Sequence, residues 1–273
     1  MICHFQKNSD SASNCNLWKY SVSGSTFLVL NLRDIWLSTI FQPGQDGAKD
    51  VEGVIFYTDH FDGTCRMRFF NPDGSPAPVC GNGMMGLVYH LATTTERTSW
   101  IIHTESGHFK GWLENKIINL DLSEIVPNSI EEVHLEIGTK NYQCYKVLVG
   151  VPHLVIFIDE LREIDLLVEG KAIRSHQKFD PEGTNVNFVK IENSSLISMR
   201  TYERGVEGET VACGTGALAA FCLAFRQGYV DSRVEVIPIS GKKFTIGRHG
   251  SPARVILTGS VELLSVESLA QES

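Results

Sequence analysis

Short apolar runs bounded by turn residues recur along most of the chain, and this pattern predicts a protein dominated by β-strands. Two segments differ, because residues 84–92 and 217–225 follow a glycine-rich turn and carry small and apolar residues over a helix-length run. We also expect surface helices over residues 161–176 and, more briefly, 129–132. The expected strands are residues 27–32, 53–58, 66–70, 100–104, 117–122, 144–149, 154–158, 186–191, 233–237 and 255–257.

The two helix-length segments begin with the same turn, Cys80-Gly81-Asn82-Gly83 and Cys213-Gly214-Thr215-Gly216. Their cysteines lie 133 residues apart, close to half of the 273 residues, which indicates duplication of a whole domain. We place the boundary near residues 126–128, giving halves of residues 1–126 and 127–259. The first 16 residues are expected to form an extension, and a final strand within residues 260–273 is expected to return to the first half.

Composition and charge exclude several classes of protein. The chain is 42% hydrophobic and has 24 Lys and Arg against 32 Asp and Glu, a net charge of -8. Because the basic residues do not cluster, we expect no nucleic-acid partner. The longest apolar runs have strand length, so we expect no membrane span. Residues 1–16 lack the features of a secretory signal, which makes the cytoplasm the expected compartment and thiols the expected state of the seven cysteines.

Each Cys-Gly-x-Gly turn places a thiol just before a helix whose first N–H groups have no intrahelical partner. The positive end of a helix favours a carboxylate, and we expect it to lower the pKa of the adjacent thiol. If the halves pack about a pseudo-twofold axis, one sulfur stands on each side of a bound carboxylate. Such an arrangement suits removal of a proton from the α-carbon and return of a proton to the opposite face.

A single turn of this kind is more often structural, since a lone buried cysteine usually behaves as a small hydrophobic residue. The matched pair favours chemistry at Cys80 and Cys213, and the other five cysteines have no such context. No two cysteines have the Cys-x2-Cys spacing of zinc ligands, so no metal site is expected. No lysine stands in a recognisable pyridoxal phosphate context, and two opposed thiols would make that cofactor unnecessary. We therefore expect no cofactor.

With both turns in view, the sequence resembles the diaminopimelate epimerase family from about Trp18 onward. The first signature runs from Asn-Pro-Asp-Gly-Ser to Cys-Gly-Asn-Gly over residues 71–83, and the second runs from Glu-Arg-Gly to Ala-Cys-Gly-Thr-Gly-Ala over residues 203–217. The resemblance implies an α+β fold of two pseudo-symmetric domains, each a strongly curved mixed or antiparallel sheet wrapped around a central helix. It also implies a homodimeric, cofactor-independent isomerase that interconverts LL- and meso-diaminopimelate in lysine and peptidoglycan-precursor biosynthesis.

The resemblance also assigns roles to individual residues. Cys80 and Cys213 would be the acid–base thiols, with His153 paired to the first and Glu203 beside the second. An arginine in this context is a plausible bidentate partner for a distal carboxylate. The implied substrate-binding residues are Asn71, Gly81, Asn82, Asn185, Arg204, Gly214, Thr215, Ser25 and Glu52.

Several positions depart from the family pattern. Ser25 replaces a substrate-contacting asparagine, Glu52 aligns loosely with an expected glutamine, and Val151 replaces the asparagine before Pro-His. The second signature also has one extra residue, within residues 206–208. Because unpaired polar groups are what reject wrong ligands, the losses at Ser25 and Val151 predict looser discrimination, extending to an acidic amino acid such as glutamate.

Two rival interpretations remain open. One is another two-cysteine racemase or epimerase of the same fold, related to proline racemase or to phenazine-pathway isomerases; Asp73 and Arg204 in the two signatures favour the diaminopimelate branch. The other is a catalytically silent ligand-binding protein, against which the presence of both thiols argues. Two facing thiols can also oxidise, so we expect activity to require a reductant.

Overall fold

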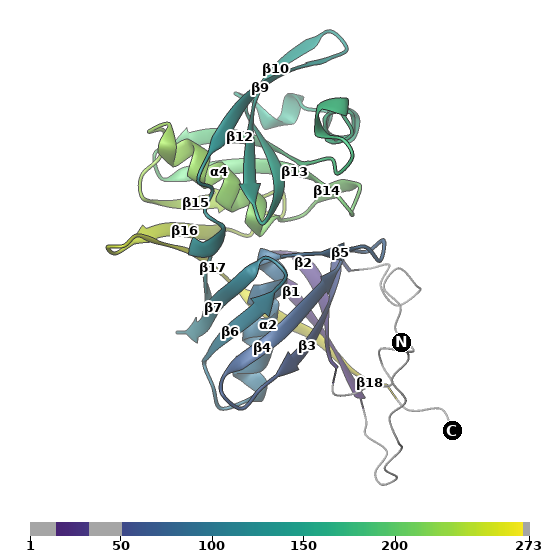
Figure 1. Cartoon of the computed structure of the whole chain (residues 1–273), viewed down its shortest axis with the longest axis vertical. Helices are drawn as coiled ribbons and strands as arrows, with labels where there is room; N and C mark the ends of the chain where they lie inside the picture. The colour runs from purple at the N-terminus through teal and green to yellow at the C-terminus, as the bar shows by residue number, and fades with distance from the viewer. Residues whose placement is uncertain (1–14, 33–50, 270–273) are drawn as a thin grey trace.

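A computed structural model describes residues 15–32 and 51–269, which leaves most of the expected N-terminal extension outside the described residues. The strands form one sheet of 18 that curls around two helices (Figure 1). Up to the middle of the chain, the elements are β1 (Cys15–Val22), β2 (Ser25–Asn31), β3 (Gly53–Asp59), β4 (Thr64–Phe70), β5 (Pro76–Ala77), α2 (Gly81–Thr94), β6 (Ser99–Thr104), β7 (Gly107–Glu114), β8 (Ile117–Asp121) and the 3-10 turn η2 (Ser123–Ile125).

The rest of the chain contains a second helix inside a second set of strands. Its elements are β9 (Ile130–Ile137), β10 (Lys140–Val149), β11 (Val151–Phe157), η3 (Leu161–Glu163), η4 (Leu166–Gly170), α3 (Lys171–Arg174), η5 (Gln177–Phe179), β12 (Asn185–Asn193), β13 (Leu196–Glu203), β14 (Gly208–Thr210), α4 (Gly214–Arg226), β15 (Arg233–Ile237), β16 (Phe244–His249), β17 (Arg254–Gly259) and β18 (Val261–Leu269). The expected α+β class is confirmed.

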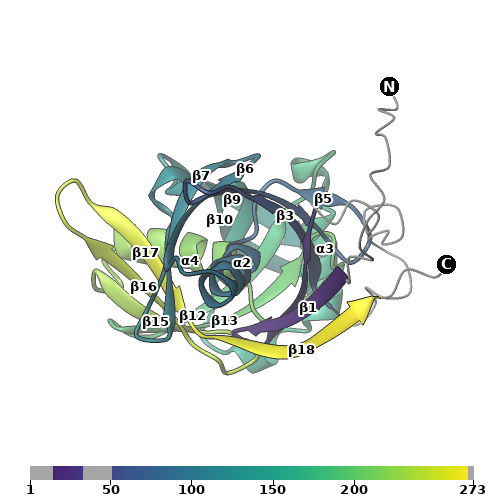
Figure 2. The ribbon, with the colours of Figure 1, turned by 90° about the horizontal axis from the view of Figure 1, so that it is seen from below.

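Several strands are amphipathic, whereas the two long helices are apolar nearly all round. In β4, Cys65, Met67 and Phe69 are buried and alternate with exposed arginines, as a strand with one face on a core requires. Helix α2 is buried along nearly its whole length, because strands surround it on every side in the end-on view (Figure 2). A helix that is apolar all round is stable only in such an interior position.

Most of the expected elements are present. The helices predicted over residues 84–92 and 217–225 are the interiors of α2 and α4. Residues 161–176 form only short helical turns, namely η3, η4 and α3. The helix predicted near residues 129–132 is wrong, because β9 begins at Ile130 and pairs with β10. Its acidic residues Glu131 and Glu132 are both exposed on this strand, and Glu131 pairs with Lys146 across the ladder at 3.3 Å.

Long-range pairing joins the two halves of the sequence. Strand β18 pairs antiparallel with β1, and β17 pairs antiparallel with β8. The proposed boundary at residues 126–128 falls between η2 and β9. No helix within residues 15–32 and 51–269 has the length and apolar character needed to span a bilayer.

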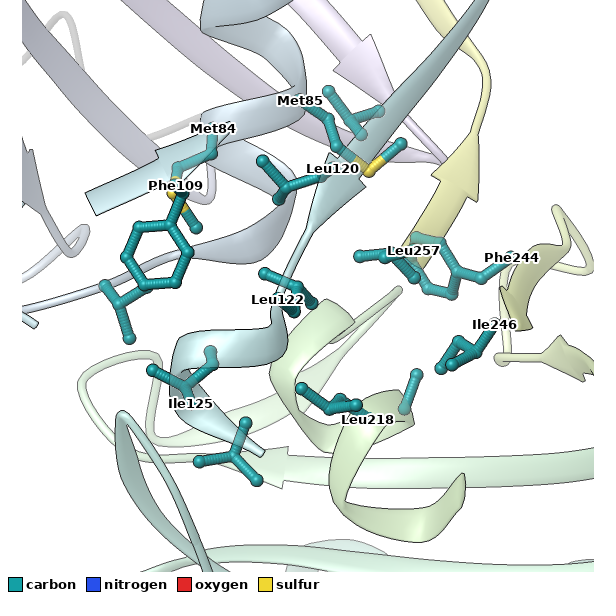
Figure 3. Close-up of a cluster of buried hydrophobic side chains, with 14 of the residues drawn as sticks. Met84, Met85, Phe109, Leu120, Leu122, Ile125, Leu218, Phe244, Ile246 and Leu257 are labelled. Atoms are coloured by element: carbon teal, nitrogen blue, oxygen red, sulfur yellow. The ribbon is translucent and has the colours of Figure 1, made fainter. Parts of the chain in front are cut away.

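One apolar core runs without a break from α2 to α4. Figure 3 shows Met84 and Met85 of α2, Leu120 of β8, Leu257 of β17 and Leu218 of α4 in one cluster. All five side chains are fully buried. Because these groups interdigitate, the core fixes the position of one central helix relative to the other.

Candidate active site

The first residue of each repeated turn is a cysteine that forms the N-cap of a helix. Cys80 caps α2, and its Sγ accepts the N–H of Gly83 at 3.3 Å. Cys213 caps α4, and its Sγ accepts the N–H of Gly216 at 3.4 Å. The repeated sequence therefore builds the same local structure twice, with a sulfur at the position where a serine or aspartate oxygen usually caps a helix.

The N-termini of α2 and α4 abut. A Cβ atom placed on Gly81 would lie 3.6 Å from the Cα of Gly214, and one placed on Gly214 would lie 2.7 Å from Oδ1 of Asn82. Only glycine permits this approach at residue 214, because any side chain there would displace Asn82. The first N–H groups of both helices and both thiols consequently belong to one site.

Burial raises the pKa of both thiols above the ordinary value, and the nearby Glu203 carboxyl raises it further. The backbone N–H groups at the two helix N-termini act in the opposite direction but are the weaker influence. The expectation that the helix end would lower the pKa of each cysteine is therefore wrong for these thiols. Desolvation outweighs the helix terminus because a thiolate loses its hydration in this interior site.

Two carboxyl groups stand beside the thiols. Burial and the neighbouring Glu52 raise the pKa of Glu203 to about 7. Burial also raises the pKa of Glu52, whose Oε1 accepts the N–H of Val211 at 3.3 Å. Thr210 is a hydrogen-bond partner of both carboxyls, and Glu203 also contacts Cys213. Glu203 is therefore poised between its two protonation states near neutral pH, next to the second thiol.

Asn82 links the first turn to the second. Its Nδ2 donates to the carbonyl of Ala212 at 3.0 Å and to Oγ of Ser25 at 3.5 Å, and Ser25 donates to the same carbonyl at 3.1 Å. Oδ1 of Asn82 is buried and has no hydrogen-bond partner among residues 15–32 and 51–269. Thr215 lies with its hydroxyl 3.6 Å from the sulfur of Cys213.

His153 is buried beneath this site in a defined orientation. Asn187 donates to its Nδ1 at 3.2 Å, so the ring proton is on Nε2, which has no partner among the described residues. Burial and the neighbouring Arg204 lower the pKa of His153 to about 3, which keeps the ring neutral. No hydrogen bond between described residues joins His153 to Cys80, although Pro78 and His153 line one cavity.

Asn187 is a site residue that the sequence interpretation did not assign. Besides holding His153, it donates to the carbonyl of Leu154 at 3.0 Å and accepts the hydroxyl of Thr201 at 3.1 Å. A Cβ on Gly216 would collide with its amide, so it also abuts the first turn of α4. The signal was present, because residues two apart on a strand share a face and Asn185 had been assigned.

The remaining candidates converge from both halves of the sequence. Oδ1 of Asn185 accepts the backbone N–H of Arg204 at 2.8 Å, and the guanidinium of Arg204 donates to the carbonyl of Glu182 at 3.2 Å. Gly205 has a φ of +86° and lies so close to Asn71 that a Cβ would collide with the Asn71 amide. Arg204 lines the cavity of about 730 Å³ that also contains His153.

Comparison with known proteins agrees with this geometry. The family described as Diaminopimelate epimerase matches residues 145–264. The diaminopimelate epimerase of Aquifex aeolicus is 31% identical over 93% of this chain and 98% of its own length, and that of a Hydrogenobaculum species is 33% identical over 84% and 89%.

Solved structures of low identity show the same fold. A PhzF-family phenazine biosynthesis protein from Bacillus anthracis superimposes with a TM-score of 0.71 at 13% identity, covering 95% of this chain and all of the other. A hydroxyproline epimerase from Agrobacterium vitis gives 0.70 at 15% identity, covering 95% and 93%. Full-length relatives above 30% identity and a site built from two cysteine-capped helices lead to one assignment: the chain belongs to the diaminopimelate epimerase family.

Proposed function

We propose that this isomerase interconverts LL- and meso-diaminopimelate without a cofactor, as a step towards lysine and peptidoglycan precursors. The observation that carries the proposal is the abutting of the two helix N-termini capped by Cys80 and Cys213. The proposed substrate is inferred from the names of the full-length relatives. A cytoplasmic homodimer is part of the proposal, and the exposed Leu263, Leu264 and Val266 of β18 support an apolar contact between copies, which light scattering would test.

In the proposed reaction, the substrate carboxylate binds the free N–H groups at the first turns of α2 and α4. One sulfur, as thiolate, removes the α-proton, and the other, as thiol, donates a proton to the opposite face of the carbanion. The configuration inverts, and the two sulfurs exchange protonation states. Their roles are opposite in the reverse direction, as microscopic reversibility requires.

The raised thiol pKa means that a base must help to form the thiolate. Glu203 contacts Cys213 and has a pKa of about 7, so its ionised form can accept the thiol proton. His153 has its proton on Nε2 and its Nδ1 engaged by Asn187. In this orientation the imidazole is a hydrogen-bond donor, and it would stabilise an anion rather than remove a proton.

Arg204 is proposed to bind the distal carboxylate of diaminopimelate. Its side chain lines the cavity together with Lys146 and Lys178, and the fork of a guanidinium matches a carboxylate with two parallel hydrogen bonds. A substrate extending from the thiols into this cavity would therefore place one carboxylate at the helix termini and the other at Arg204.

Deuterium incorporation from D2O into LL-diaminopimelate, followed by proton NMR without added cofactor, tests the proposal. We expect the wild-type protein to invert one centre with deuterium there, and C80A and C213A each to lower the rate about 10²- to 10⁴-fold. The matched control is C222A, which removes a partly buried thiol of α4 outside the site. Undiminished inversion by either C80A or C213A would refute the assigned roles.

The same assay decides the breadth of specificity. Val151 lines the cavity and presents methyl groups there, so this wall is without the amide that the family pattern has. We propose that D- and L-glutamate also exchange their α-protons, more slowly than diaminopimelate. Unchanged glutamate spectra under conditions that fully exchange diaminopimelate would remove this part of the proposal and leave the first part standing.

A further inference from the structure

Residues 206–208, the segment of the second signature that has one extra residue, include an unusual backbone conformation. Glu207 has a φ of +52°, in the left-handed region that glycine adopts readily and a glutamate rarely does. It stands in the turn between β13 and β14, just after Glu203 and Arg204. A non-glycine residue persists in such a conformation only where its surroundings hold it there.

Hydrogen bonds to the carboxylate hold Glu207 in this conformation. Arg174, at the end of α3, donates from Nε to both carboxylate oxygens at 3.0 Å and from Nη2 to Oε1 at 2.7 Å. Oε1 also accepts the N–H of Gly205 at 3.1 Å, and the N–H of Glu207 donates to the carbonyl of Glu203 at 2.8 Å. The carboxylate thus closes the turn internally and ties it to another element.

Arg174 connects this turn to the neighbouring 180–184 segment, which also lines the cavity. Its guanidinium packs so closely on Gly183 that a Cβ there would collide with it, and Gly183 lines the cavity beside Glu182 and Thr184. The carbonyl of Glu182 in turn accepts from Arg204. The Arg174–Glu207 ion pair therefore connects the two segments that position the Arg204 guanidinium, residues 203–208 and residues 180–184.

We propose that the Arg174–Glu207 pair is a positioning device that fixes the 203–208 turn against the 180–184 loop and so sets the place of Arg204. The inference rests on the proposed function, because it assigns the pair an effect on binding of the distal carboxylate. In this proposal, Arg174 and Glu207 act through the position of Arg204 and take no part in the proton transfer.

Replacing Glu207 by glycine distinguishes the effect of the carboxylate from the effect of the backbone conformation. E207G keeps a residue that adopts the positive φ without strain, so a turn that needs only its backbone shape is preserved. We expect E207G and R174Q each to raise the KM for diaminopimelate about 5- to 10-fold with kcat changed less than about 2-fold. Because the two side chains act together, the double variant should be no worse than either single one.

The matched control is R254Q, which breaks another exposed arginine–carboxylate pair, away from the cavity. Arg254 donates from Nε and Nη2 to one oxygen of Asp121 at 2.8 and 2.5 Å, joining β17 to the end of β8. We expect R254Q to leave KM unchanged. A KM for E207G within 2-fold of the wild-type value would overturn the proposal.

Hydrogen exchange of the ligand-free proteins, read by mass spectrometry, decides the inference independently of activity. Peptides covering residues 203–208 and 180–184 should exchange faster in E207G and R174Q than in the wild type, and not in R254Q. Unchanged exchange in both segments would also overturn the proposal. If wild-type protein fails to turn over diaminopimelate, the proposed function fails, and the exchange result still decides whether the pair holds these segments.

Discussion

The protonation of Glu203 depends on a second carboxyl group. Glu52 and Glu203 share Thr210 as a hydrogen-bond partner, and repulsion between their charges is one cause of the raised pKa of Glu203. Since Glu203 must be ionised to accept a proton from Cys213, kcat/KM should rise with pH through about 7 in the wild type.

Replacing Glu52 by glutamine should shift this pH dependence. E52Q keeps the shape of the side chain and removes its charge, so the pKa of Glu203 falls and the acid limb of kcat/KM moves to lower pH. Relative to the wild type, the ratio of activity at pH 6 to activity at pH 8 should increase. A pH profile from 5 to 9 measures this, and an acid limb that stays in place or moves to higher pH would contradict the coupling of the two carboxyls.

The raised pKa of Glu203 makes the stability of the folded protein depend on pH. The folded-state pKa of Glu203, about 7, is above its ordinary value of 4.5, so the folded protein binds the proton more tightly than the unfolded chain does. The contribution of Glu203 to the free energy of unfolding is fully present below about pH 4.5 and is lost as the pH rises through 7. Thermal unfolding across the same pH range should show that E52Q loses less stability with rising pH than the wild type does, because the pKa of Glu203 in the variant is closer to its unfolded value.

The pair of cysteine turns could be predicted from sequence because the pattern occurs twice, and each copy folds locally into the same helix cap. The raised pKa of the two thiols could not be predicted in this way. Burial of Cys80 and Cys213 and the closeness of Glu203 depend on how distant segments pack, and these two effects outweigh the local helix terminus. Thr210 was missed for the same reason, because its partner Glu52 is far away in sequence.

At the scale of elements, the site depends on how α2 and α4 meet. Leu257 of β17 packs behind both N-termini, with its Cδ2 3.7 Å from a Cβ placed on Gly81 and 3.3 Å from one placed on Gly214. It is fully buried. One leucine therefore supports the glycines that follow both catalytic candidates.

Replacing Leu257 by alanine should destabilise the protein and loosen the site. The cavity left behind should lower the free energy of unfolding by about 2–5 kcal/mol, and activity should fall as well, because both helix ends lose their support. Urea unfolding at 25 °C gives the first quantity and the D2O assay the second. The control is L167A on η4, where the leucine is 63% exposed and the change should be within about 0.5 kcal/mol. Equal losses in the two variants would show that Leu257 has no special position.

The central helices and most strands could be predicted from hydrophobic patterns, since both are local properties. Residues 129–132 show the limit: an acidic segment reads as a surface helix until its partner is known, and here the partner is β10 with Lys146 opposite Glu131. The return of the final strand to the first half was expected, but the register of β18 on β1 and the pairing of β17 with β8 were beyond a local pattern, because register across more than a hundred residues is set by tertiary packing.

At the scale of the whole molecule, two copies of one turn supply one site. Neither half of the sequence contains both thiols, and the continuous core under α2 and α4 holds the copies together. Glu207 and its partner Arg174 are both in the second half, in the segment that we propose positions Arg204 for the distal carboxylate.

A bond between the two sulfurs would join the halves and remove both proposed acid–base groups at once. We expect diamide to abolish activity, dithiothreitol to restore it, and the peptide containing Cys80 to become linked to that containing Cys213. Thiolate is the reacting species and the pKa of both thiols is raised, so inactivation should be slow at neutral pH and accelerate as the pH rises. Peptide mapping before and after reduction identifies the link, and C222S excludes the partly buried thiol of α4 as the cause. Full activity in protein shown to carry the Cys80–Cys213 link would mean that these sulfurs are not the groups that move the proton.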